Sequence, residues 1–302
     1  MRRYGTARYL YDLVETLDED AQDRSSLRMA QSYRGLRQSP LVYVDVGARG
    51  GLDRRLDPFR EVLRPVLFEP DPVEYARLTA TLADTSATVI PAAAGARRER
   101  RMVHLTKKRG NSSLLPPTGS AIGLTAIEGE GLGRYEVEAV AEVEVRPLGD
   151  CLDELGIRAE ILKIDTQGFE WEVLQGLGDH LPHLVVAECA TTEIYAGQTS
   201  LWRIGLHLEQ LGFFAVRFMR RHAVPTVGIR HRASLQLYGD VTFVPSLAPA
   251  GRANIERAPE RWFACLCLHG LSDLAVWQAT ELGLLDTPLI AETLRISSSR
   301  GR

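Results

Sequence analysis

The chain has 302 residues, 45% hydrophobic and 25% charged, which is the ordinary balance of a globular protein with a sizeable core. Its formal net charge of −3 argues against a protein that binds nucleic acid through bulk electrostatic attraction. No apolar run is long enough to span a membrane, and the first residues lack the pattern of a secretory signal. The spacing of the four cysteines is unlike that of metal ligands, which favours reduced thiols. We therefore expect a soluble cytoplasmic protein without a nucleic-acid or membrane partner.

The N-terminal segment, residues 1–40, is predicted to be a helical extension. Apolar residues recur at three- and four-residue intervals between Tyr9 and Leu17, as on one face of an amphipathic helix. Such a face packs against the core or against a second copy of the chain.

The most informative stretch of the sequence begins at Leu41. Leu41–Val46 is an almost continuous apolar run, typical of a parallel strand that is buried on both faces. Three glycines follow it, Gly47, Gly50 and Gly51, and they allow a tight turn that a ligand can approach closely. These features predict a strand, a turn and a ligand site at the end of the strand.

A second apolar run, Val66–Phe68, ends at Glu69. An acid on the next strand, about twenty residues after a glycine turn, is the position from which a carboxylate accepts hydrogen bonds from ribose hydroxyls. The sequence therefore predicts a nucleoside site, with Glu69 bound to the ribose.

The type of nucleoside follows from Asp45, two residues before the first glycine. A carboxylate there repels a pyrophosphate and suits a ligand that carries an ammonium group, as S-adenosylmethionine does. The spacing G-A-R-G-G also differs from dinucleotide and P-loop patterns. We assign Asp45 to the methionine ammonium and the turn from Gly47 to Gly51 to the same moiety. Arg49 either contacts the methionine carboxylate or caps the following helix.

The next elements are a helix at Pro72–Ala83 and a short strand at Thr88–Ile90. Small residues follow this strand, and Ala93 among them leaves room for an adenine ring. Farther on, Ser113 belongs to a cluster of small hydrogen-bonding residues that is predicted to contact cofactor or substrate. Glu136–Val145 alternates between acidic and apolar residues, as a half-exposed strand does.

Two further apolar runs end in acids. Ile161–Ile164 ends at Asp165, and Leu184–Ala187 ends at Glu188. Because ligands bind at the carboxyl ends of strands in an open α/β sheet, these acids are expected to converge on one crevice with those of the first two strands. Asp165 is the candidate general base or ligand of a divalent ion, and Glu188 is its candidate partner in catalysis and in a Mg²⁺ site.

The C-terminal part is predicted to hold a helix at Leu201–Leu211 and strands at Phe213–Met219 and Val241–Val244. Residues 247–302 then form a second helical extension, in which Pro259–Leu284 is predicted to be helical. The terminal helices are candidate contacts of a homodimer.

Five blocks of the sequence together resemble the FkbM family of S-adenosylmethionine-dependent methyltransferases. They are VDVGARGG, FEPDP, NSSL, ILKIDTQGFEWEVLQG and DVTFV, spread from Leu41 to Val244. The resemblance implies an α/β, Rossmann-like class I methyltransferase domain over residues 41–246. Its sheet would have seven strands, mostly parallel with the last antiparallel, and helices on both faces. The implied reaction is O-methylation of a hydroxyl on a small-molecule acceptor such as a sugar, a polyketide or another secondary metabolite.

The chain departs from the family pattern at two places. Arg49 and Gly50 stand where many members have Asn and Ile, and Gln167 stands where many have Glu. The second departure removes a carboxylate from the crevice, so a role of that Glu as base or metal ligand is not transferred. Two alternatives stay open from the sequence: a nicotinamide-dependent oxidoreductase, and a cofactor-binding or scaffold protein without turnover.

Overall fold

The computed structural model describes residues 34–118, 132–223 and 235–291. Contacts between residues divide the chain into two units. The larger unit comprises Leu41–Arg54 and Arg64–Arg257, and the smaller unit comprises Arg55–Leu63 with the described parts of residues 1–40 and 258–302. The domain bounds drawn from the sequence, 41–246, stay a prediction.

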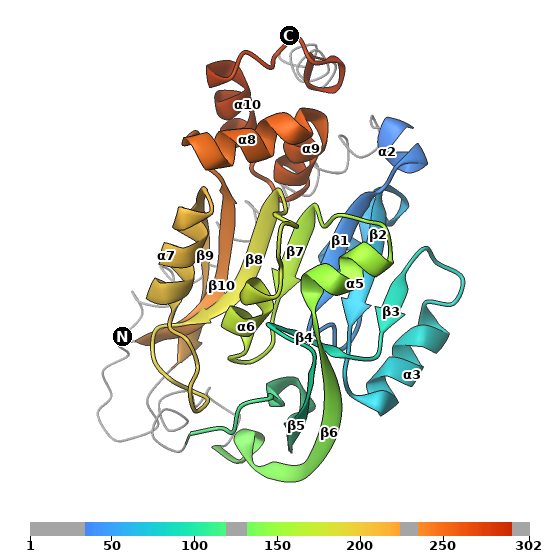
Figure 1. The fold of residues 1–302 in the computed structure, drawn as a ribbon, viewed down its shortest axis with the longest axis vertical. Helices are drawn as coiled ribbons and strands as arrows, with labels where there is room; N and C mark the ends of the chain where they lie inside the picture. Colours follow the sequence, from blue (N-terminus) through green and yellow to red (C-terminus); the bar gives the residue numbers. More distant parts are fainter. Residues whose placement is uncertain (1–33, 119–131, 224–234, 292–302) are drawn as a thin grey trace, which may run out of the picture. The chain divides into compact units, whose positions relative to one another are not determined.

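A seven-stranded sheet forms the centre of the larger unit (Figure 1), with strand order β3-β2-β1-β7-β8-β10-β9. The strands are β1 (Leu41–Val46), β2 (Leu63–Phe68), β3 (Thr88–Ile90), β7 (Ile161–Ile164), β8 (Leu184–Ala190), β9 (Phe213–Ala223) and β10 (Leu235–Pro245). The pairs β2–β3, β1–β7 and β7–β8 are parallel, whereas β10 is antiparallel to β8 and to β9. The predicted seven-stranded, mostly parallel sheet is confirmed.

The apolar runs of the sequence form the centre of this sheet. All six residues of β1 are buried, and β7 and β8 contribute further fully buried residues to the main core. Continuous burial on both faces is the reason why these strands show no alternation of polar and apolar residues. The core is completed by helices whose bounds are α3 (Pro72–Thr81), α5 (Leu148–Glu154), α6 (Glu170–Gln175), α7 (Leu201–Gln210) and α8 (Pro249–Arg257).

A second sheet of the larger unit has three strands, in the order β4-β6-β5. They are β4 (Ala93–Gly95), β5 (Glu99–Thr106) and β6 (Val137–Pro147), with β4 parallel and β5 antiparallel to β6. Cross-strand ion pairs such as Arg100–Glu142 lie on its exposed side. The strand predicted at Glu136–Val145 forms most of β6, but its place in a separate sheet was not predicted, since strand partners are not visible in the sequence.

The smaller unit is mainly helical. It contains α2 (Arg34–Gln38), α9 (Pro259–Leu268), α10 (Ser272–Glu281) and most of the 3₁₀ segment η1 (Arg54–Val62). The stretch predicted to be helical, Pro259–Leu284, contains two helices, because Gly270 adopts a positive φ of 66° and separates α9 from α10. This is the conformation with which glycine commonly ends a helix.

The predicted N-terminal amphipathic helix between Tyr9 and Leu17 lies outside the described residues. Within the described parts of the chain, no helix is long and apolar enough to cross a membrane. The dimer through the terminal helices stays a prediction.

Candidate functional site

A cavity of about 190 Å³ lies at the carboxyl ends of β1, β2 and β7 in the larger unit; it is called the first cavity below. Six of the residues predicted to bind cofactor line it: Gly47, Arg49, Glu69, Ala93, Ser113 and Asp165. Three other predicted residues, Asp45, Gly51 and Glu188, are not among its described lining residues. The crevice expected from the parallel sheet is therefore present, with a smaller set of acids than predicted.

Gly47 brings the first turn against the end of β7. The β1–β7 register pairs Val46 with Ile164, so Gly47 and Asp165 follow side by side. A Cβ atom on Gly47 would lie 2.0 Å from the backbone oxygen of Asp165, and its φ is +87°. Only glycine fits such a contact with this backbone conformation, so the two cavity-lining segments meet because residue 47 has no side chain.

Glu69 is a buried carboxylate in the wall of the first cavity, with 3% of its surface exposed. Its Oε1 accepts a hydrogen bond of 2.9 Å from the backbone N–H of Asp71. Burial raises the pKa of Glu69 to about 7. Because a carboxylate has several lone pairs, Glu69 has acceptor capacity left for the hydroxyl groups of a ligand.

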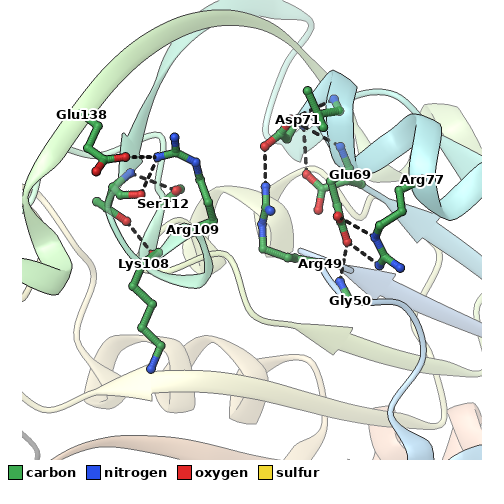
Figure 2. Close-up of polar contacts among 12 residues, drawn as sticks. Arg49, Gly50, Glu69, Asp71, Arg77, Lys108, Arg109, Ser112 and Glu138 are labelled. Atoms are coloured by element: carbon green, nitrogen blue, oxygen red, sulfur yellow. Dashed lines mark hydrogen bonds and ion pairs between the residues drawn. The ribbon is translucent and has the colours of Figure 1, made fainter. Parts of the chain in front are cut away.

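The side chain of Arg49 connects the glycine turn to the start of α3 (Figure 2). Its Nη2 lies 2.5 Å from Oδ2 of Asp71, and Oδ1 of Asp71 accepts from the N–H of Val73 at 2.9 Å as the N-cap of α3. The backbone N–H of Gly50 donates to Glu74 of the same helix at 2.7 Å. Arg49 thus binds the residue that caps the helix, and the predicted contact with a methionine carboxylate stays a prediction.

Asp45 has a partner within the protein. It faces Lys163 in the β1–β7 register, and its Oδ1 lies 3.0 Å from Lys163 Nζ. Burial raises the pKa of Asp45, and Lys163 opposes that shift. An unpaired buried carboxylate is costly, and Lys163 gives Asp45 a partner inside the protein that could not be predicted from the sequence. The contact of Asp45 with a methionine ammonium stays a prediction.

Gln167 joins the two predicted catalytic carboxylates. Its Nε2 donates to Asp165 Oδ1 at 2.8 Å and to Glu188 Oε2 at 2.6 Å. Its Oε1 accepts from the hydroxyl of Tyr195 at 2.8 Å. These contacts fix which end of the amide faces the carboxylates. Asp165 and Glu188 therefore come together as predicted, but through the amide that stands where many relatives have Glu.

Glu170 holds the turn that presents Gln167. Its Oε1 accepts hydrogen bonds from Thr166 N, Thr166 Oγ1 and Gly168 N, each 3.0 Å long. Gln167 itself has a positive φ of 57°, which is uncommon for a residue other than glycine. Burial raises the pKa of Glu170 to about 7. Sequence analysis missed Glu170, although an acid in the first turn of a helix, just after a glycine turn, is a recognisable signal for such contacts.

A second cavity, of about 260 Å³, lies on the other side of Gln167, which lines both. Glu188 lines the second cavity together with tyrosines and with basic and amide side chains from distant parts of the larger unit. Of the two described cavities, Asp165 lines the first. The paired carboxylates therefore serve different cavities.

The predicted Mg²⁺ site is not supported. Among the described residues, no group of three or more His, Cys, Asp or Glu side chains is placed to hold a metal ion. The space between Asp165 and Glu188 holds the amide nitrogen of Gln167, a donor where a cation would need an oxygen ligand. The residues present do not fit the ion, and no step is assigned to it.

The strand order of the main sheet, with β10 as its one antiparallel strand among the described residues, defines the class I methyltransferase fold. Residues 45–215 match the family described as the methyltransferase FkbM domain. The chain belongs to this family of methyltransferases. No curated protein matches it significantly in sequence.

Two solved structures of methyltransferases are similar to this chain at low identity. A precorrin-6y C5,15-methyltransferase from Geobacter metallireducens GS-15 is 12% identical with a TM-score of 0.34, over 68% of this chain and 81% of that chain. The Burkholderia thailandensis 1,6-didemethyltoxoflavin-N1-methyltransferase, solved with 1,6-didemethyltoxoflavin and S-adenosylhomocysteine, is 12% identical with a TM-score of 0.31, over 82% and 91%.

Proposed function

We propose that this chain transfers the methyl group of S-adenosylmethionine to a hydroxyl group of a small-molecule acceptor, such as a sugar, a polyketide or another secondary metabolite. The observation that carries the proposal is the pair of cavities that meet at Gln167. One holds residues suited to a nucleoside, and the other holds a carboxylate suited to an acceptor hydroxyl. Membership of a methyltransferase family supports the same reading over the nicotinamide alternative.

The first cavity is the proposed donor site. Glu69 would accept hydrogen bonds from the two ribose hydroxyls, and Ala93 would leave room for the adenine ring beside it. Gly47, with Arg49 at the rim, would hold the methionine end, and Asp165 would contact the donor at the end of β7. Ser113 would hold the backbone of Gln167 in place, because its Oγ donates to the carbonyl of Gln167 at 2.7 Å.

The reaction needs alignment and removal of one proton. The acceptor oxygen attacks the methyl carbon while the carbon–sulfur bond breaks, its electron pair stays on sulfur, and S-adenosylhomocysteine leaves. The hydroxyl proton passes to Glu188, which lines the acceptor side. Alignment supplies about 7 to 11 kcal/mol, and a general base supplies about 10²- to 10⁴-fold. Positioning by the two cavities is therefore the larger contribution.

Calorimetry with S-adenosylhomocysteine and, separately, with NAD tests the donor. We expect binding of S-adenosylhomocysteine and none of NAD. A folded protein that binds neither would support the non-catalytic alternative instead.

The role of Glu188 is tested with Glu188→Gln once an acceptor is known. We expect methyl transfer to fall about 10²-fold or more, with little change in affinity for S-adenosylhomocysteine. A variant that keeps full transfer would remove Glu188 from the mechanism. A homodimer and a cytoplasmic location remain predictions from the sequence.

A further inference from the structure

The second cavity is rich in hydrogen-bond donors at one end. Lys108, Asn111 and Arg134 line it there, and Glu188 lines it beside Gln167. We propose that this cavity binds an acceptor which carries an anionic oxygen group, a carboxylate or a phosphate, in addition to the hydroxyl that is methylated. This inference rests on the proposed function and adds the chemical class of the acceptor to it.

Asn111 contributes a donor without a partner. Its side-chain Nδ2 is buried and makes no hydrogen bond in the structure. A buried donor left unsatisfied is costly, and such groups in native proteins call for an explanation. Because Asn111 lines the second cavity, an oxygen atom of a ligand there would satisfy the amide.

Arg134 contributes a planar cation that is held in place. Only 8% of its surface is exposed, its guanidinium lies 4.8 Å from the centre of the Tyr135 ring, and its Nη2 donates to the Tyr135 hydroxyl at 3.3 Å. A guanidinium fixed in this way presents parallel N–H groups, the geometry that matches a carboxylate or a phosphate.

Lys108 adds a second positive charge to the same end. Its backbone N–H donates to the carbonyl of Arg134 at 3.2 Å, so the two basic residues are neighbours. Figure 2 shows the Lys108 side chain extending away from the ion pair of Arg109 and Glu138. Among the described residues that line the cavity, two are cations and one, Glu188, is a carboxylate, which favours a ligand with negative charge.

Tyr195 connects the donor end to the carboxylate end. Its hydroxyl lies 3.0 Å from the carbonyl oxygen of Asn111 and 2.8 Å from Oε1 of Gln167. An anionic group held at Lys108 and Arg134 would be repelled by Glu188, so the hydroxyl rather than the anion of the acceptor would lie beside Gln167 and the first cavity. The charge pattern thus orients the acceptor as well as binding it.

The test measures thermal stability of the full chain saturated with S-adenosylhomocysteine, at constant ionic strength. The probes are inorganic phosphate against chloride, and D-glucuronate against D-glucose, so that phosphate and carboxylate recognition are separated. We expect the melting temperature to rise with concentration for at least one anion and not for its matched control. No rise with phosphate or glucuronate would overturn the inference.

Variants locate the effect. Lys108→Met and Asn111→Leu should each lose half or more of the anion-dependent rise, whereas Arg100→Gln, at an exposed arginine of β5, should keep it. Arg134→Gln should abolish the rise; should that variant fail to fold, the other two decide. A rise that stays complete in Lys108→Met and Asn111→Leu contradicts the assigned site.

Calorimetry separates this inference from the proposed function. If the wild type binds S-adenosylhomocysteine but no anion adds stability, only the anionic acceptor is excluded. If the wild type does not bind S-adenosylhomocysteine, the proposed donor site fails, and the acceptor assignment fails with it.

Discussion

Asp45 and Lys163 face each other across the β1–β7 pair, with 3.0 Å between Oδ1 and Nζ. Asp45 is 2% exposed, so its charge depends on this lysine. Asp45→Asn should leave the Lys163 cation without its buried partner and lower the free energy of unfolding by about 3 to 5 kcal/mol. Urea denaturation measures the loss.

The matched control is Arg100→Gln, which breaks an exposed ion pair with Glu142 and should change stability by less than about 1 kcal/mol. The alternative role of Asp45, binding of the donor ammonium, predicts a different result. An Asp45→Asn variant of unchanged stability, with about tenfold weaker binding of S-adenosylhomocysteine, would restore that role.

Glu69 should make donor binding depend on pH. Burial raises its pKa to about 7, and the ionised form is the better acceptor for ribose hydroxyls. The affinity of the wild type for S-adenosylhomocysteine should therefore rise between pH 6 and pH 8. Glu69→Gln should bind about tenfold more weakly at pH 8 and lose this dependence. Calorimetry across the pH range is the measurement, with Glu209→Gln as the control at an exposed glutamate.

The stability of the ligand-free protein should change with pH in the opposite sense. The pKa of Glu69 is about 7 in the folded protein against 4.5 for an ordinary glutamate, so the folded state holds the proton more tightly. The stabilisation is complete below about pH 4.5 and is lost as pH rises through 7. Above pH 7, Glu69→Gln should be more stable than the wild type by up to about 3 kcal/mol. Equal stability of the two proteins at pH 5 and pH 8 would contradict the burial of this carboxylate.

The parts of this structure that sequence reasoning predicted depend on local signals. Leu41–Val46 and Ile161–Ile164 were predicted to the residue, because strands buried on both faces appear as apolar runs with sharp ends. The glycine turn and Glu69 followed from spacing within one βαβ unit. The glycine turn and Glu69 lie within about thirty residues of one another, the length of one βαβ unit.

The parts that were missed depend on contacts between distant segments. Lys163 faces Asp45 across a strand pair that spans more than a hundred positions of the sequence, and no local pattern shows that register. Arg134, in the 3₁₀ helix Leu132–Tyr135, and Tyr195 reach the second cavity from distant parts of the sequence. The break between α9 and α10 at Gly270 was also not predicted, although the stretch around it was predicted to be helical.

Gln167→Glu should replace the neutral amide between Asp165 and Glu188 by a carboxylate, which gives a cluster of three carboxylates. The new oxygen would replace an amide that now lies 2.8 Å from Asp165 and 2.6 Å from Glu188. Like charges at this distance raise the pKa of the introduced carboxyl, so the variant should lose more stability than the wild type between pH 6 and pH 8. Thermal melts at both pH values check this, with Gln210→Glu as an exposed control.

The same variant tests the metal hypothesis. Three carboxylates offer the oxygen ligands that Mg²⁺ prefers, so Mg²⁺ should raise the melting temperature of Gln167→Glu and leave that of the wild type unchanged. Wild-type turnover should also survive dialysis against EDTA. A fall in that turnover that is reversed by Mg²⁺ would show that Asp165 and Glu188 bind metal despite the amide between them.

Glu170 is the residue on which the geometry of Gln167 depends. Its Oε1 accepts from three donors in the turn at Thr166–Gly168, and 1% of its surface is exposed. Glu170→Ala leaves these donors without an acceptor and should cost about 2 to 5 kcal/mol of stability. Glu170→Gln keeps an acceptor oxygen, so it should lose much less.

Activity distinguishes positioning from plain stability in this pair of variants. At a temperature where both are folded, Glu170→Ala should lower kcat more than it weakens binding of S-adenosylhomocysteine, because the turn that aligns Gln167 with Asp165 and Glu188 has relaxed. Glu170→Gln should restore most of kcat. Equal kcat in the folded Ala and Gln variants would mean that the turn keeps its shape without this acceptor, and that Glu170 contributes to folding alone.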